Sequence, residues 1–301
     1  MKTLDALITV YSHLYCSNMI INRILGFLRF FIRWFANRFV FFLLKNDGKK
    51  VKYDGRPIVV SLTSFPARIG NVWIVIRCLL NQTVKPKKIL LWLSKDQFPD
   101  LKYVPNSLRV LQDDIFEICF VDGDLKSYKK FFYVFENYEN DYVVTVDDDI
   151  FYPSTMLESM LRKAKNDEIV VCRHGVNMRY KNGKLLPYSD WNQKKDGVEG
   201  SFFFGSGGGT MFLPSKLYKD VLDEKLFLLL APKADDVWLN AMVRLSKLKI
   251  VNIPSGAILP VINKRNVTLC SENVGENLND AQLRNVSEYY LKNIKIDPFA
   301  R

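Results

Sequence analysis

The sequence predicts an α/β fold with a mainly parallel central sheet, and two observations lead to this class. Short runs rich in Val, Ile and Leu, typical of buried strands, alternate with segments of helical length from Arg56 onward. Strands separated by helices pair in parallel through right-handed crossovers. The chain has 301 residues and is 48% hydrophobic, which is enough for one large core. We therefore expect one domain over residues 54–301, preceded by a segment of different character over residues 1–53.

Residues 1–53 carry most of the net charge. They hold nine Lys and Arg against two Asp, a net charge of +7, while 34 Lys and Arg against 30 Asp and Glu leave +4 for the rest. Because the basic excess is confined to this segment, we expect no nucleic-acid partner. The five cysteines are odd in number and far apart, which favours neither a disulfide framework nor a zinc site and fits a reducing cytosol.

Within that segment, residues 19–45 are predicted to form an amphipathic helix. Four arginines interrupt its apolar run, so it is not an ordinary spanning helix. A helical wheel puts the arginines on one face, with Trp34 and Phe41 among them, opposite Ile24, Leu25, Leu28, Phe31, Ile32, Phe35, Phe39, Phe42 and Leu43. We expect peripheral binding to an anionic membrane surface, at the cytoplasmic face. The alternative is a helix packed on the domain or on a second subunit.

The elements of the main domain follow in order. We expect strands at residues 57–62, 88–93, 115–121, 141–146 and 168–172 and helices at 72–80, 125–138 and 153 to about 165. The run Lys181-Asn-Gly-Lys184 is typical of a hairpin turn. The aromatic-rich stretch 177–200 is a candidate wall for a substrate.

The most informative segment is 142–150, in which an apolar strand leads directly into Asp147, Asp148 and Asp149. Ligands bind beyond the carboxyl ends of parallel strands, so these acids lie where a ligand is expected. Three adjacent anions repel one another, and a hard divalent cation that bridges phosphate oxygens would neutralise them. The run predicts a metal–diphosphate site. The alternative is a solvated acidic turn or a helix N-terminus, with Pro153 in the first turn.

Other polar groups are expected at the same edge. The run Ser61 to Arg68 follows the first strand and offers hydroxyls and a guanidinium, and Asp96 follows the next. The basic cluster Lys126 to Lys130 opens the helix before the acidic strand, although alone it is equally a solvated helix face. The glycines from Gly205 to Gly209 let a backbone approach a ligand closely, or form a plain turn.

Two further carboxylates, Asp235 and Asp236, are expected at the start of a helix. A carboxylate in that position caps the helix, but a second one held near a sugar can act as a general base. The sequence leaves both readings open.

Taken in order, these segments resemble the GT-A glycosyltransferases, particularly the family 2-like bacterial enzymes that build surface polysaccharides. The resemblance covers about residues 58–290. It rests on five motifs in the family's order, namely Val59-Val-Ser-Leu-Thr-Ser-Phe-Pro-Ala-Arg-Ile69, Leu79-Leu-Asn-Gln-Thr83, Asp147-Asp-Asp149, the glycine loop Gly205 to Gly209 and Ala234-Asp-Asp236.

The resemblance implies a Rossmann-like GT-A domain and a set of roles. Asp147 would contact the donor ribose or the metal, Asp149 would ligate Mn²⁺ or Mg²⁺, and Asp236, with Asp235 beside it, would deprotonate the acceptor. The donor-binding candidates are Thr63, Arg68, Asp96, Lys126, Lys129, Asp147, Asp148, Gly207 and Gly208. Many members of the family supply a late histidine to the metal, whereas the two histidines here, His13 and His174, precede the glycine loop. His174 either lines the site or is structural, and Asn263, Asn273, Asn279 or water could complete the metal shell.

We therefore expect a metal-dependent glycosyltransferase that moves a sugar from a nucleotide-diphosphate donor to a hydroxyl of a glycan or lipid-linked glycan. It would be inverting with Asp236 as base, or retaining if Asp235 and Asp236 only position the substrate. A nucleotidyltransferase also binds metal and phosphate with clustered acids. A non-catalytic carbohydrate-binding or scaffold protein of the same fold would need no base.

Overall fold

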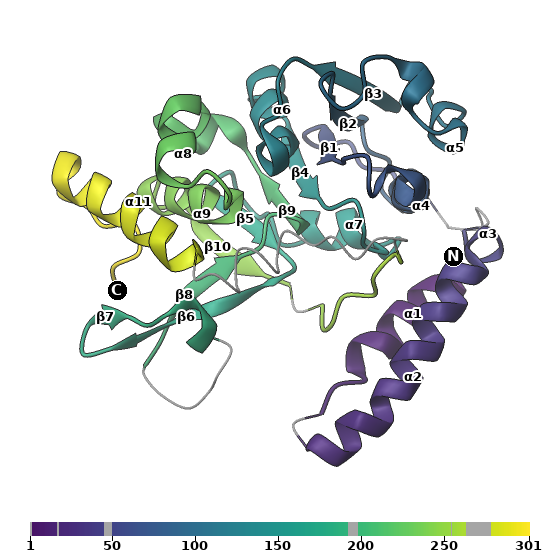
Figure 1. The fold of residues 1–301 in the computed structure, drawn as a ribbon, viewed down its shortest axis with the longest axis horizontal. Coiled ribbons are helices and arrows are strands. Elements are labelled where there is room, and N and C mark those ends of the chain that lie inside the picture. Colours follow the sequence, from purple (N-terminus) through teal and green to yellow (C-terminus); the bar gives the residue numbers. More distant parts are fainter. Residues whose placement is uncertain (1, 17, 45–49, 192–197, 254, 263–277) are drawn as a thin grey trace.

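The computed structural model describes residues 2–16, 18–44, 50–191, 198–253, 255–262 and 278–301 (Figure 1). Within these residues the centre is a seven-stranded sheet in the order β10-β5-β9-β4-β1-β2-β3. Its strands are β1 (Ile58–Thr63), β2 (Lys88–Ser94), β3 (Phe116–Val121), β4 (Tyr142–Val146), β5 (Ile169–Cys172), β9 (Gly208–Phe212) and β10 (Lys249–Asn252). Among the described strand pairs, only those of β9 with its two neighbours, β4 and β5, are antiparallel. The predicted α/β class with a mainly parallel sheet is confirmed.

Side chains alternate across the sheet between two apolar layers. In β1, Val60 and Leu62 pack into one core cluster while Val59 packs into the other, and in β4 Val144 and Val143 divide in the same way. Successive side chains of a strand point to opposite faces, so a strand of β-branched residues can fill both layers at once.

Helices from both halves of the chain cover the sheet. They are α4 (Val72–Leu80), α5 (Asn106–Arg109), α6 (Phe132–Asn137), α7 (Met156–Leu161), α8 (Glu224–Leu230), α9 (Asp235–Leu245) and α11 (Leu278–Ile294). The helix expected at 72–80 is confirmed residue for residue. The helix expected at 125–138 is instead a 3₁₀ turn over Lys126–Lys130 followed by α6, because Tyr128, Lys129 and Lys130 are all buried and reach partners on three different segments.

A smaller antiparallel sheet joins β6 (Gly175–Lys181), β7 (Lys184–Leu185) and β8 (Val198–Phe204). The predicted hairpin turn is confirmed, because Asn182 and Gly183 both have positive φ angles, 52° and 76°, as a type I′ turn requires. Tyr180 and Trp191 of the proposed substrate wall are buried in the core of this sheet, at 2% and 4% exposure. Residues 192–197 of that stretch lie outside the described residues.

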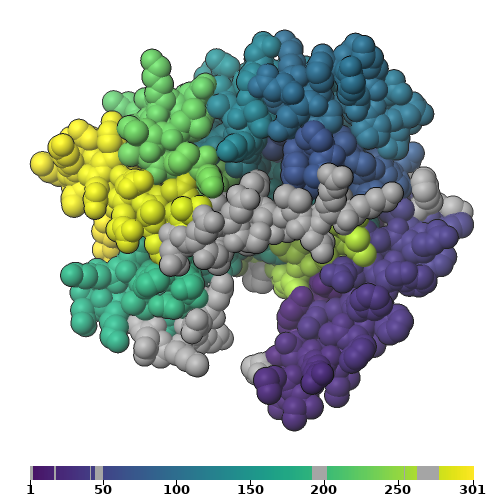
Figure 2. All heavy atoms as spheres, viewed as in Figure 1, coloured from purple at the N-terminus to yellow at the C-terminus, as the bar shows by residue number. Residues whose placement is uncertain are grey.

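The N-terminal segment is a helical hairpin of α1 (Lys2–His13) and α2 (Met19–Arg38), followed by the short helix α3 (Val40–Leu43). Figure 2 shows it standing out from the body of the molecule. Its inner side chains, Leu4, Ile8, Ala36, Val40 and Leu43, belong to the same core cluster as the sheet. The boundary of the main domain after residue 53 stays a prediction. None of the described helices is long and apolar enough to cross a membrane.

The predicted apolar face of this helix is rotated from the face that is exposed. Leu25 and Ile32 turn inward, whereas Trp34, placed by the wheel among the arginines, is exposed. The cause is α1, a helix that the sequence did not predict. Arg29 donates to the Leu14 carbonyl and lies over the Tyr15 ring, both just after the end of α1, so the arginine side of α2 is partly covered.

Candidate functional site

The acidic turn and the glycine turn meet at the end of β4. The Asp147 N–H donates to the Gly207 carbonyl at 2.9 Å, which continues the pairing of β4 with β9. A side chain at Gly207 would overlap the Asp147 carboxyl group, and one at Gly208 would overlap the His174 ring. The absence of a side chain at Gly207 therefore leaves room for the Asp147 carboxyl group, and its absence at Gly208 leaves room for the His174 ring.

The three acids of the turn differ in environment. Asp148 is buried and accepts hydrogen bonds from Ser64 Oγ at 2.6 Å and Arg68 Nη1 at 2.9 Å. The side chains of Asp147 and Asp149 remain 42% and 28% exposed. Burial raises the pKa of Asp149 to about 6, and the neighbouring Asp147 adds to that shift. Asp148 therefore ties the turn to the loop after β1, and Arg68 Nη1 also lies 2.8 Å from Asp149 Oδ2, so that Asp147 is the more exposed of its two neighbours.

Lys130 joins the acidic turn to α9. Its Nζ lies 3.1 Å from Asp147 Oδ1 and 3.1 Å from Asp235 Oδ2, and the residue is 6% exposed. Burial alone would lower the pKa of Lys130, but Asp147 and Asp235 outweigh it and raise that pKa above its ordinary value. The lysine is thus a fixed cation between carboxylates from two distant parts of the sequence.

Asp235 and Asp236 begin α9, as expected, and both are bound by Ser206 of the glycine turn. Ser206 Oγ donates to Asp235 Oδ2 at 2.7 Å, and the Ser206 N–H donates to Asp236 Oδ1 at 2.7 Å. Burial opposes ionisation of Asp235, but Lys130 and Ser206 hold its pKa below the ordinary range. Burial, and then Asp235, raise the pKa of Asp236 to about 6. Ala234 occupies the N-cap and supplies no side-chain cap.

A cavity of about 250 Å³ opens beside this cluster. Its lining includes six of the predicted donor-binding residues, Thr63, Arg68, Lys126, Lys129, Asp147 and Asp148. The other lining residues, which the sequence did not single out as binding residues, are Ser64, Phe65, Gln97, Asp124, Ser127 and Lys130. The cavity thus combines hydroxyls, cations and acids at the carboxyl edge of the sheet.

Asp96 differs from this group, because it is exposed and does not line the cavity. The next residue, Gln97, does line it and donates to Asp124 Oδ2 at 2.8 Å. Asp124 also pairs with Lys129, which is buried. Asp124 follows β3 as Asp96 follows β2. The reasoning that selected Asp96, that ligands bind beyond the carboxyl ends of parallel strands, could therefore also have found Asp124.

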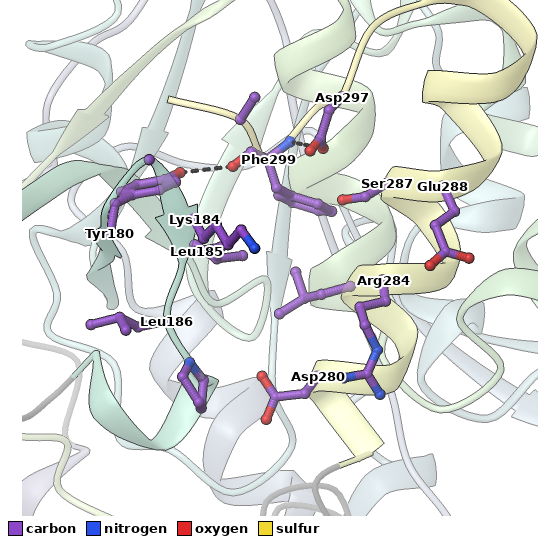
Figure 3. A pocket seen from close by; sticks show the side chains of 14 residues that line it. Tyr180, Lys184, Leu185, Leu186, Asp280, Arg284, Ser287, Glu288, Asp297 and Phe299 are labelled. Carbon is purple, nitrogen blue, oxygen red and sulfur yellow. Dashed lines mark hydrogen bonds between the residues drawn. The ribbon is translucent and has the colours of Figure 1, made fainter. Parts of the chain in front are cut away.

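A larger hollow of about 650 Å³ lies between the β6–β7 hairpin and α11 (Figure 3) and shares no lining residue with this cavity. The Asp280 carboxylate accepts from the Tyr188 N–H at 2.9 Å, and Tyr180 Oη donates to the Phe299 carbonyl at 2.8 Å. These polar groups serve local packing. We place the candidate site in the smaller cavity because charged groups from several elements converge there.

The described residues offer two partly exposed carboxylates for a metal, Asp147 and Asp149, which pair here with Lys130 and Arg68. No three His, Cys, Asp or Glu side chains of the described residues are grouped as a metal site. Carboxylate oxygens suit Mg²⁺ or Mn²⁺, and Mg²⁺ keeps several waters, so two carboxylates with phosphate oxygens and water form a fitting donor set. Burial lowers the pKa of His174 to about 4, and Ser255 Oγ lies 3.0 Å from its Nε2. Asn279 lies on α11, whereas Asn263 and Asn273 are outside the described residues.

No protein-family model matches the chain, and no curated protein matches it. The mannosyltransferase from Pyrobaculum calidifontis, solved in complex with GDP-Man and Mn²⁺, matches with a TM-score of 0.48 at 11% identity, over 99% of this chain and 79% of its own. The 4-diphosphocytidyl-2C-methyl-D-erythritol synthase from Anaerococcus prevotii matches with a TM-score of 0.43 at 14% identity, over 76% of this chain and 97% of its own. HddC from Yersinia pseudotuberculosis matches with a TM-score of 0.39 at 12% identity, over 76% of this chain and 99% of its own. Likeness this distant identifies no reaction.

Proposed function

We propose that the chain is a metal-dependent glycosyltransferase of GT-A type, which moves a sugar from a nucleotide-diphosphate donor to a hydroxyl of a glycan or lipid-linked glycan. One observation carries the proposal. The acidic turn after β4 and the acidic start of α9 are drawn together around Lys130, beside a cavity lined by cations and hydroxyls. Such a reaction needs both an anion-binding side and a base within one site.

The donor side of the site is the cavity, which Asp147 lines, with Asp149 in the same acidic turn. Arg68 and Lys126 supply positive charge along the wall, where a diphosphate would be attracted. A divalent cation held by Asp147 and Asp149 would neutralise the negative charge of the donor diphosphate and so favour the departure of the nucleoside diphosphate. Asp148, fixed by Ser64 and Arg68, keeps the turn in place.

Asp236 is the better candidate for the base. Asp235 is held as a carboxylate by Lys130 and Ser206, and its lowered pKa makes it a weak proton acceptor. The pKa of Asp236, near 6, allows it to be ionised at neutral pH and still take a proton readily. We assign Asp235 and Lys130 as positioning residues. With Asp236 as base the reaction inverts the anomeric carbon, and the anomeric configuration of the product tests this.

The test of the donor site is calorimetry with a panel of nucleotide sugars, with and without Mn²⁺. We expect Asp149→Asn to lower metal-dependent donor affinity by roughly tenfold or more, because it removes one of two charged metal ligands. Asp96→Asn is the matched control and should leave affinity unchanged, since Asp96 is exposed and outside the cavity lining. Equal affinity of the wild type and Asp149→Asn would reject the metal assignment.

The products separate the alternative functions. Release of a nucleoside diphosphate with transfer of the sugar supports the glycosyltransferase, whereas release of inorganic diphosphate from a nucleoside triphosphate identifies a nucleotidyltransferase. Donor binding without turnover against any acceptor would favour the non-catalytic carbohydrate-binding or scaffold protein.

A further inference from the structure

Helix α2 is apolar on two sides, and only one of them is covered. Ile32 and Ala36, four residues apart, pack on the core cluster of the body, and Leu25, two turns before Ile32, is partly buried. A second apolar stripe, with members every three to four residues, lies on another side of the helix and is exposed. It consists of Ile20, Ile24, Phe27, Phe31, Trp34 and Phe35, which we call the outer face.

The outer face is exposed to an extent that a soluble surface rarely shows. Ile20, Phe27 and Phe31 are 71%, 67% and 59% exposed, and they follow one another along a single helix. Comparably exposed apolar side chains of the main body, such as Val110 and Leu229, belong to separate segments. A contiguous apolar patch of this kind marks a surface that binds a partner.

The charges around the outer face indicate which kind of partner it binds. Arg23 and Arg38 are exposed toward the two ends of α2, and the helix contains no acidic residue. Asp5 of α1 is turned to the body, where it accepts a hydrogen bond from the Ser154 N–H at 2.8 Å. At the far end of the hairpin a hollow of about 600 Å³ brings Met19 and Ile20 beside arginine side chains. Apolar and cationic groups side by side match acyl chains and anionic headgroups.

We propose that the outer face docks into the surface of an anionic lipid bilayer, with α2 lying along the surface. An aromatic-rich stripe of this kind suits the headgroup boundary, where Trp and Phe side chains bury their rings. The docking does not depend on the reaction proposed above, because it rests on the hairpin alone.

The base of the hairpin is tied to the acidic turn through residues 260–262. Asn37 donates to the Pro260 carbonyl at 3.2 Å and accepts from the Ile262 N–H at 2.8 Å. Between them, the Val261 N–H donates to the Asp149 carbonyl at 2.7 Å. A docked hairpin therefore fixes the acidic turn relative to the bilayer. Together with the proposed function, this favours a lipid-linked acceptor over a free glycan.

The test is co-sedimentation of the full chain with vesicles of phosphatidylcholine alone and of phosphatidylcholine mixed with phosphatidylserine. We expect binding to the anionic vesicles that weakens as salt rises, and little binding to the neutral ones. The double variant Phe27→Ser and Phe31→Ser should bind roughly tenfold or more weakly, because two exposed rings are lost. The matched control, Val110→Ser with Leu229→Ser, removes equally exposed side chains from the body and should bind as the wild type does.

Light scattering and thermal melting on the same preparations complete the test. Melting temperatures equal to that of the wild type show that the double variant is folded, so its loss of vesicle binding is a surface effect. Equal binding to neutral and anionic vesicles, or no binding to either, would overturn the proposal. A wild-type dimer that the double variant converts to a monomer, without vesicle binding, would assign the outer face to a second copy of the chain.

Discussion

Two adjacent aspartates at the start of α9 are placed in opposite electrostatic situations. Asp235 sits against the Lys130 ammonium, whereas Asp236 lies beyond it and is repelled by Asp235. The same burial therefore leaves one carboxylate with a lowered pKa and the other with a raised one. Pairs of acids whose environments separate their pKa values in this way often divide the roles of positioning and proton transfer.

The first prediction concerns Asp236→Asn. An amide cannot accept the acceptor proton, so we expect turnover to fall by roughly a hundredfold or more while donor affinity stays near that of the wild type. The wild-type rate should rise with pH through about 6 and level off above it, because the base must be ionised. Steady-state kinetics between pH 4 and 8, about two units on either side of the Asp236 pKa of about 6, measure both effects.

Stability distinguishes this role from helix capping. Because the folded pKa of Asp236 lies above its unfolded value, the wild type loses stability as pH rises from about 4 through 6. Asp236→Asn should then melt no lower than the wild type at pH 7. A capping carboxylate predicts the reverse, a loss of roughly 1 kcal/mol with near-normal turnover, and that result would end the assignment of Asp236 as base.

At the scale of elements, the glycine turn between β8 and β9 sets the geometry of the site. We expect Gly207→Ala to displace the Asp147 carboxyl group, with a loss of roughly 1–3 kcal/mol in unfolding free energy and a lower metal-dependent donor affinity. Gly205→Ala is the control, because its added carbon would meet only Asp236 Oδ2, at 3.9 Å. Urea unfolding and calorimetry on both variants give the comparison, and indistinguishable variants would contradict it.

Lys130 connects two elements that the sheet alone would leave separate. Lys130→Met removes the cation from two carboxylates, one of them buried, so we expect the unfolding free energy to fall by roughly 3–5 kcal/mol. Lys126→Met is the control within the same turn. Lys126 is exposed and should change stability by no more than about 0.5 kcal/mol. If urea unfolding shows the same small change for both, Lys130 does not hold the site together.

The sequence predicted those elements whose pattern is local. The helix 72–80 and the turn at Asn182-Gly183 follow from periodicity and turn chemistry, and the strand before Asp147 follows from a run of β-branched residues. The role of Lys130 could not be predicted in the same way, because its partners Asp147 and Asp235 are brought together only when distant segments fold. The break at Phe131 has the same origin, since buried tertiary partners override the helical pattern of 125–138.

The N-terminal hairpin packs on the body and also carries the surface that we propose to bind a bilayer, two roles that the sequence presented as alternatives. Its outer face is free for a bilayer, while its inner face completes a core cluster shared with β1, β2 and α4. The helical wheel could not separate these faces, because the inward direction depends on where α1 and the sheet lie. The hairpin proposed as a membrane anchor is thus also part of the folded body.

The last prediction follows from that double role. Deleting residues 1–44 removes Leu4, Ile8, Val40 and Leu43 from the core. It also removes Asp5, the acceptor of the hydrogen bond from the Ser154 N–H. Burial of each such side chain contributes about 1.5–3 kcal/mol, but part of that burial is against other residues of the hairpin. We therefore expect the unfolding free energy to fall by roughly 3–6 kcal/mol, a large share of a typical domain's stability. Thermal melting should show a lower transition or aggregation, whereas Phe27→Ser with Phe31→Ser should melt as the wild type does. A truncated chain that melts normally and binds donor would make the hairpin a detachable anchor.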